Sequence, residues 1–221
     1  MLDRENEATP ADCTAGATPE VTLKPDLDAA PTLQNLADTD VQRLLTYLGG
    51  PVQFASMVPD GGPMRFAIFE AGDPAADAFV ARNDREARSS YYSLNRVRPG
   101  LSSKATKADI VEAIGAHADI DPRKAGGPFD KPAVIARLRS LDVPPSFIVD
   151  SGGGLQPIWL FDAPTGDFDL VEGVNRSLVA LFDADPGTFN IDRLLRVPGS
   201  LNTPNAKKAA AGRVPVMARF L

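Results

Sequence analysis

The chain has 221 residues, 43% of them hydrophobic, and a formal net charge of −6. This length allows one sizeable core, and no apolar run approaches the ~20 residues that a membrane span requires, so we expect a cytoplasmic protein without a membrane partner. With one cysteine, Cys13, and one histidine, His117, the chain cannot build a disulfide or a Cys/His zinc site by itself, and any metal must be held by oxygen ligands.

The acidity of the chain is concentrated at its start. Residues 1–40 hold nine acidic residues against Arg4 and Lys24, whereas the remainder is nearly neutral. Residues 1–36 also lack large apolar residues in any sustained period, so we predict a disordered acidic tail there and a single folded domain over residues 37–221.

Helix and strand signals alternate through the first half of that domain. Thr39 or Asp38 is a suitable N-cap for a helix that ends at Gly49. Strand-like runs follow at 52–57, 64–69 and 89–94, with a helical stretch at 74–82 between the last two. Thr106 is a suitable cap for a further helix through Ile114, and residues 116–121 read as extended.

The second half shows the same mixture. Helical patterns cover 131–141 and 168–182, and strand patterns cover 146–149, 155–161, 193–197 and 213–220. Strands and helices mixed in this way predict an α+β fold.

The segment His117-Ala118-Asp119-Ile120-Asp121-Pro122 carries two acids that alternate with apolar residues. In an extended chain Ala118 and Ile120 point into the core, while Asp119 and Asp121 project side by side on the other face. A divalent cation relieves the repulsion of such a pair. A turn-forming acidic pair before Pro122 is the alternative interpretation.

A glycine turn, Ser151-Gly152-Gly153-Gly154, joins two predicted strands and is followed by Gln156. Glycines allow a backbone path that exposes successive N–H groups to a phosphate, although a hairpin turn alone also accounts for the segment.

The segment Asn190 to Asn202 contains Asp192, Arg193 and Arg196, and Lys207 and Lys208 follow it. An acid with two arginines suits a metal ligand beside phosphate contacts, and a simple ion pair between Asp192 and an arginine is the alternative.

Taken in this order, the three segments resemble the archaeo-eukaryotic primase superfamily, most closely the RepB-like and primase-polymerase proteins of plasmids, phages and mobile elements. The resemblance covers roughly residues 90–210 and is most specific over Asp192 to Asn202. It implies a catalytic core with an RRM-like antiparallel sheet that carries the acidic triad Asp119, Asp121 and Asp192, flanked by helices.

The resemblance further implies two Mg²⁺ or Mn²⁺ ions held by those three acids, with single-stranded DNA as template and nucleoside triphosphates as substrates. A helicase domain or protein is a further partner that the family allows. The implied nucleotide contacts are Ser151, Gly153, Gly154, Gln156, Arg193, Arg196, Lys207 and Lys208.

Two departures from the family are visible. Gln156 stands where many members have a histidine, and the chain cannot form the zinc-binding element that many members carry. Two other functions remain as alternatives, a two-metal nuclease and a non-catalytic module that binds a replication origin.

Overall fold

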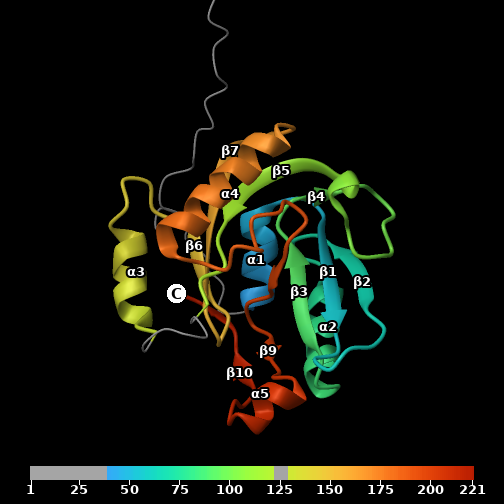
Figure 1. Cartoon of the computed structure of the whole chain (residues 1–221). Coiled ribbons are helices and arrows are strands. Elements are labelled where there is room, and N and C mark those ends of the chain that lie inside the picture. Colours follow the sequence, from blue (N-terminus) through green and yellow to red (C-terminus); the bar gives the residue numbers. More distant parts are fainter. Residues whose placement is uncertain (1–38, 122–128) are drawn as a thin grey trace, which may run out of the picture.

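The computed structural model describes residues 39–121 and 129–221 (Figure 1). The predicted disordered tail over 1–36, including Cys13, lies outside these residues. The described helices are α1 Asp40–Leu48, α2 Pro74–Arg85, α3 Lys131–Arg139, α4 Phe168–Phe182 and α5 Ala206–Ala210. The described strands are β1 Val52–Met57, β2 Arg65–Phe69, β3 Ser89–Ser93, β4 Arg96–Val97, β5 Ile110–His117, β6 Phe147–Asp150, β7 Leu155–Thr165, β8 Leu194–Arg196, β9 Leu201–Asn202, β10 Val216–Met217 and β11 Arg219–Phe220.

The strands form two larger antiparallel sheets and one small one. The four-stranded sheet has the order β2-β1-β3-β8, the five-stranded sheet has the order β11-β6-β7-β5-β4, and β10 pairs with β9. This is the predicted α+β class. The expectation that one sheet carries all three acids is wrong, because Asp119 and Asp121 follow β5 of the five-stranded sheet while Asp192 precedes β8 of the four-stranded one.

Local sequence signals explain most of the element boundaries. The Thr39 side chain accepts a hydrogen bond from the Gln42 amide at the start of α1, and Gly49 ends the helix with a φ of 61°. The helix places Leu44 and Leu45 in the core. The second predicted helix is also present, as α2, and begins with Asp73 as its N-cap.

The helix expected from Thr106 to Ile114 is absent. Thr106 does cap a turn, since its amide and hydroxyl both donate to Asp109, but that turn is a 3₁₀ helix of only three residues, Lys107–Asp109. The chain then enters β5, which pairs with β7. Ile110, Ala113 and Ile114 fit a helical spacing, so tertiary pairing overrides the local pattern here.

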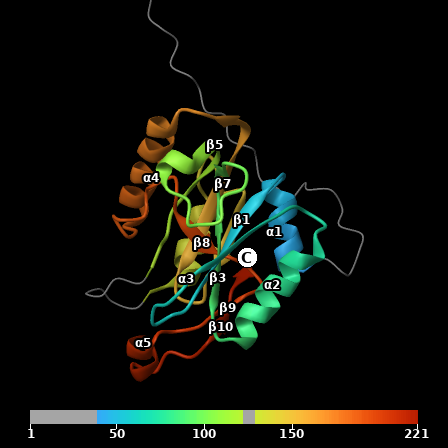
Figure 2. The ribbon, with the colours of Figure 1, turned by 90° about the vertical axis from the view of Figure 1, so that its right-hand side faces the viewer.

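The main core lies between the two large sheets and against α1 and α2. It includes Phe54 and Tyr92 from the four-stranded sheet and Val149 and Ile158 from the five-stranded sheet. Figures 1 and 2 show α1 beside both sheets and α2 alongside β1 and β3. Because this core fixes one sheet against the other, the end of β5 and the start of β7 are held at a set distance from the start of β8.

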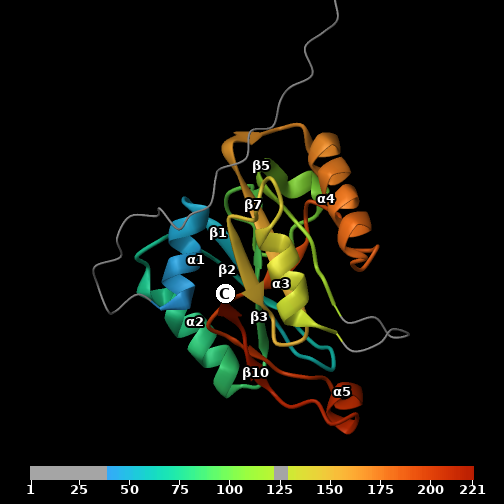
Figure 3. The ribbon, with the colours of Figure 1, turned by 90° about the vertical axis from the view of Figure 1, so that its left-hand side faces the viewer.

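A second core covers the other face of the five-stranded sheet. Leu138 of α3 and Val171 and Phe182 of α4 are buried there against Trp159 and Phe161 of β7. Figure 3 shows α3 and α4 together on this side of the molecule. Among the residues placed by the structure, no helix is long and apolar enough to cross a membrane.

Candidate active site

Asp119 and Asp121 lie just beyond β5, where the chain stays extended. Ile120 forms an isolated bridge to Leu155, with both N–O distances at 2.9 Å. Ala118 and Ile120 are buried, as the alternation predicts. Asp119 is largely covered and Asp121 is exposed, so the bridge at Ile120 fixes where both carboxylates emerge.

Asp119 is the most strongly perturbed carboxylate of this region. Burial raises its pKa above the ordinary value, and the charges of Asp121 and Asp185 raise it further. A hydrogen bond from Gln156 Nε2, at 3.1 Å from Asp119 Oδ1, and the guanidinium of Arg193 act in the opposite direction. The Arg193 Nη2 atom lies 3.6 Å from Asp119 Oδ2 and is therefore its counter-charge in this conformation.

The glycine turn fits tightly against the acidic segment. A Cβ at Gly154 would overlap Asp121 Oδ1 and the Ile120 carbonyl oxygen, so only glycine is compatible with this approach. The Ser151 hydroxyl accepts from the Gly154 amide at 3.0 Å, and Asp150 Oδ1 accepts from the Gly152 amide at 2.8 Å.

These contacts change the role expected for the turn. Two of its three glycine amides already have partners inside the turn, so a nest of free N–H groups is not present in this conformation. The turn instead brings Asp121 against the end of the β6–β7 hairpin. Lys131 of α3 fixes the same hairpin through Asp150, at 2.6 Å from Nζ to Oδ1.

Gln156 connects the two sheets at the site. Its Nε2 donates to Asp119, and its Oε1 accepts from the Arg196 backbone amide at 2.9 Å. A glutamine can bridge a carboxylate and an amide in this way because its side chain is both donor and acceptor. This function does not require the positive charge of a histidine.

The side chain of Arg196 is buried beside this bridge. Its guanidinium carbon lies 4.1 Å from the centre of the Tyr91 ring, and Nη2 donates to the Tyr91 hydroxyl at 2.8 Å and to Asn202 Oδ1 at 2.9 Å. Asn202 Nδ2 donates in turn to the Ser151 carbonyl at 2.7 Å. Burial lowers the pKa of Arg196, although a guanidinium still carries its charge at neutral pH.

Two buried donors of this region lack partners. Arg193 Nε and Arg196 Nη1 have no hydrogen-bond acceptor within the described residues. Buried donors without partners are costly, and an anion such as a phosphate would satisfy them.

The remaining predicted residues, Asp192, Lys207 and Lys208, lie apart from this cluster. Asp192 lies in a turn before β8 and accepts a hydrogen bond from Asn190 Nδ2 at 2.6 Å. Lys207 and Lys208 are exposed on α5, and only Lys208 lines the groove next to the glycine turn.

The oxygen donors of this site suit a divalent metal. Asp119 and Asp121 supply hard oxygen ligands whose charges repel one another, which suits Mg²⁺ or Mn²⁺. In residues 39–121 and 129–221, however, no group of three or more His, Cys, Asp or Glu side chains is arranged to hold a metal ion. The acidic pair fits a cation, and Asp192 is not gathered with it in this conformation.

The sequence assigns no site role to three residues of this region, Tyr91, Asn202 and Asp185. Asn202 lies inside the segment that carries the family resemblance, so its position was a usable signal. The contacts of Tyr91 depend on the pairing of β3 with β8, which no local pattern reveals.

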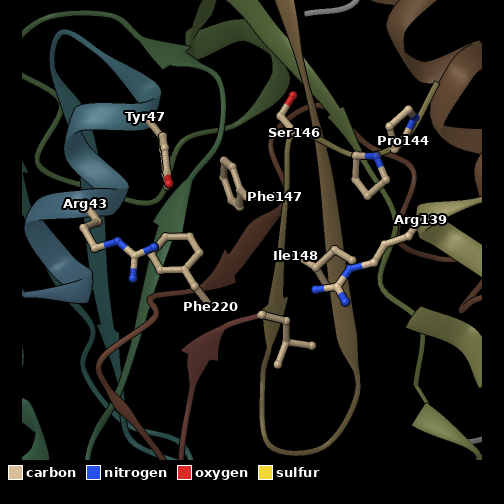
Figure 4. Close-up of a pocket in the computed structure, with 10 residues that line it drawn as sticks. Arg43, Tyr47, Arg139, Pro144, Ser146, Phe147, Ile148 and Phe220 are labelled. Atoms are coloured by element: carbon tan, nitrogen blue, oxygen red, sulfur yellow. The ribbon is translucent and has the colours of Figure 1, made fainter. Parts of the chain in front are cut away.

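A pocket of about 410 Å³ lies elsewhere in the described part of the chain. Arg43 and Tyr47 of α1 border one side, and Phe147 and Phe220 lie in the middle (Figure 4). It contains none of the residues that the sequence assigns to the site, so it is not the candidate active site.

Comparison with known proteins supports a fold assignment. No protein-family model and no curated protein sequence matches the chain. The AEP domain of the cyanophage S-2L primase-polymerase superimposes with a TM-score of 0.61 and 17% identity, over 83% of this chain and 89% of that one.

Two crystal structures of primase RepB' also match at 16% identity. One has a TM-score of 0.53 over 82% of this chain and 55% of that one. The other, the catalytic domain in complex with initiator DNA, has a TM-score of 0.51 over 81% of this chain and 84% of that one. The chain therefore has the fold of phage and plasmid primase catalytic domains.

Proposed function

We propose that residues 37–221 form the catalytic domain of a template-directed DNA primase or polymerase, which joins nucleotides from nucleoside triphosphates on single-stranded DNA. The observation that carries this proposal is the position of Asp119 and Asp121 against the Gly154 turn, beside Gln156 and Arg193, in a fold shared with primase catalytic domains. Acids next to cations with unpaired donors suit a triphosphate substrate better than a simple structural ion pair.

In the proposed site Asp119 and Asp121 would hold Mg²⁺ or Mn²⁺, and Asp192, which this conformation does not gather with them, is the third ligand that the family resemblance implies for two ions. Burial, and then the charge of Asp121, raise the Asp119 pKa, and a cation bound there would stabilise the charged carboxylate. When bound, such ions supply activation of a 3′-hydroxyl and neutralisation of the pyrophosphate leaving group. Gln156 orients the Asp119 carboxylate through its hydrogen bond to Oδ1.

The triphosphate is assigned to the cationic side of the site. Arg193 and Arg196 each offer a buried donor without a partner, and Lys207 and Lys208 add exposed charge farther out. Ser151, Gly153 and Gly154 form the turn that borders this space, and Gln156 closes it from the β7 side. Arg196 is held in place by Tyr91 and Asn202, so its guanidinium is oriented before a ligand arrives.

A primer-extension assay tests the proposal. The chain should extend a primer on single-stranded template with Mg²⁺ or Mn²⁺ and nucleoside triphosphates, and the same assay without primer tests initiation. Asp119→Asn should abolish extension, whereas the matched control Asp162→Asn, at an exposed position of β7, should retain it.

Calorimetry with a nucleoside triphosphate and Mg²⁺ separates the proposal from its alternatives. A nuclease does not need to bind the triphosphate, and a non-catalytic origin-binding module does not need to extend a primer. Extension that is equal in wild type and Asp119→Asn would contradict the proposed site. Absence of both extension and triphosphate binding in the wild type would contradict the proposed function.

A further inference from the structure

The last part of the chain forms an arm that extends away from both large sheets. It consists of β9, α5 and β10, with Asn202 paired to Val216 and Leu201 paired to Met217. Figure 1 shows α5 and β10 at the bottom of the molecule, below the β6–β7 hairpin. The arm exposes large apolar side chains, since Val214 is 68% exposed and Met217 is 49% exposed.

A groove of about 340 Å³ separates the arm from the glycine turn. On one side are Gly152 and Gly153, and on the other are residues of the arm. Val216 packs closely on the turn, because a Cβ at Gly152 would lie 3.0 Å from Val216 Cβ. The lining residues are Gly152, Gly153, Asn202, Pro204, Lys208, Gly212, Arg213, Val214 and Val216.

The groove is cationic as well as apolar. Lys208 and Arg213 line it, and no acidic residue follows Asp192 in the sequence. Two acids of the body contact the arm, and each accepts one of its backbone amides: Asp60 accepts the Ala206 amide at 2.8 Å, and Asp84 accepts the Leu201 amide at 3.0 Å. The charges of Lys208 and Arg213 are therefore available for a polyanion.

The groove is continuous with the candidate active site. A Cβ placed at Gly153 would lie 3.6 Å from Arg213 Nη1 and 3.9 Å from Asp121 Oδ1. Asn202, which lines the groove, also contacts Arg196 and the Ser151 carbonyl. A strand in the groove would thus pass directly next to the acidic pair.

We propose that this groove binds single-stranded nucleic acid, with Lys208 and Arg213 on backbone phosphates and an unstacked base against Val214 and Val216. A single strand fits better than a duplex, because the apolar wall can contact a base only when that base is free of its stack. The inference rests on the proposed function only for the identity of the strand, which would be the template.

The test measures binding without catalysis. A fluorescein-labelled oligothymidylate is titrated with the full chain in EDTA, and the anisotropy is followed from about 50 to about 200 mM salt. The double variant Lys208→Ala with Arg213→Ala should bind about tenfold more weakly at intermediate salt. Its slope of log affinity against log salt should fall by about 1.4, since each phosphate contact on a single strand contributes about 0.7.

A cation outside the groove provides a matched control. Lys104→Ala removes the same charge at an exposed position that does not line the groove, and it should change the affinity by less than about twofold. Val214→Ser removes the apolar contact at an exposed position, and it should weaken binding without altering the salt slope. Thermal melting of every variant should match the wild type because the changed side chains are exposed.

Several outcomes would overturn the inference. They are an unchanged affinity and slope in the double variant, an equal loss in Lys104→Ala, or equal competition by an unlabelled duplex. The primer-extension assay reports separately on the proposed function. If extension fails but the double variant behaves as expected, the groove stands and the catalytic proposal falls; if extension succeeds and the double variant is unchanged, only the groove falls.

Discussion

The approach of Gly154 to Asp121 allows a sharp test of how the site is built. In Gly154→Ala, the added methyl group would overlap Asp121 Oδ1 and the Ile120 carbonyl oxygen and would lie 3.0 Å from the Asp121 Cα. Two of these three atoms belong to the backbone, so a side-chain rotation cannot remove the overlap. The acidic segment must move away from the turn.

The cost of that movement follows from the contacts it breaks. Ile120 and Leu155 exchange two backbone hydrogen bonds of 2.9 Å, and each contributes about 1 kcal/mol net. Overpacking adds about 1–3 kcal/mol. We expect a total loss of about 3–5 kcal/mol, which corresponds to a Tm lower by about 6–20 °C for a chain of this size.

Gly153→Ala is the matched control for this experiment. Its methyl group would lie between 3.6 and 4.0 Å from Arg213, Asp121 and Asn202, which are ordinary contact distances. We expect its Tm to stay within about 2 °C of the wild type. Calorimetric melting and primer extension should show that Gly154→Ala alone loses stability together with synthesis. A Gly154→Ala protein that melts like the wild type would refute the tight packing of the turn on Asp121.

Three further predictions concern single residues. Asp119→Asn should lower primer extension by more than roughly 100-fold while the Tm measured in EDTA holds or rises, because the burial and repulsion that raise the Asp119 pKa disappear; a lower Tm would contradict the electrostatic argument. Arg196→Ala should raise the apparent KM for nucleotide about tenfold, because it removes a proposed phosphate contact, and lower the Tm, because it leaves the Tyr91 hydroxyl and Asn202 unpaired. An unchanged KM together with an unchanged Tm would show that Arg196 neither binds nucleotide nor stabilises the fold. Burial lowers the pKa of His117 from 6.5 to about 4, so the unfolded chain takes up a proton at a higher pH than the folded chain does. Denaturant titrations should therefore show the free energy of unfolding falling by about 3 kcal/mol as the pH drops from 6.5 to 4. A His117→Gln variant with the same pH dependence would exclude this histidine as the cause.

The neutral state of His117 also follows from its surroundings. Its Nε2 lies 2.9 Å from the Thr188 carbonyl and so donates, whereas Nδ1 faces the amide nitrogen of Asn175 at 3.4 Å. The orientation of Asn175 is fixed, because its Oδ1 accepts from the His117 amide. A second proton on the ring would face a donor, and the histidine is therefore a structural link between β5, α4 and the segment before Asp192.

The sequence is most informative where local chemistry decides the structure. The helix predicted over 168–182 is α4, because Asp167 caps it and its apolar residues keep the helical spacing throughout. The alternation around Ala118 and Ile120 correctly predicts which residues are buried. The error at Ile110 to Ile114 has the opposite origin, since a genuine capping turn precedes a run that pairs with β7 only in the folded chain.

The site residues also fall into those that local motifs reveal and those that only the folded chain brings together. Asp119, Gln156 and Arg193 are recognisable as polar residues in short motifs, and the structure brings these three together. Arg196 is held by Tyr91, which is 105 residues away in sequence, and by Asn202, which is 6 residues away. Only the contact with Tyr91 depends on the order of strands in the sheet. The sequence predicts one strand over 213–220, which the structure divides into β10 and β11. It does not predict β9 or α5, because segments of two and five residues are too short for a periodic pattern.

The turn before β8 sends the side chains of Asp192 and Arg193 to different partners. In a regular strand, neighbouring side chains face opposite sides, so Asp192 and Arg193 could not both approach Asp119. The strand begins only at Leu194, and the Arg193 amide donates to the Asn190 carbonyl at 3.2 Å within the preceding turn. This turn directs Arg193 to Asp119 while Asn190 holds the Asp192 carboxylate. Since Arg193 is the counter-charge of Asp119 here, a cation bound to Asp119 would compete with the guanidinium and leave it free for an anionic substrate.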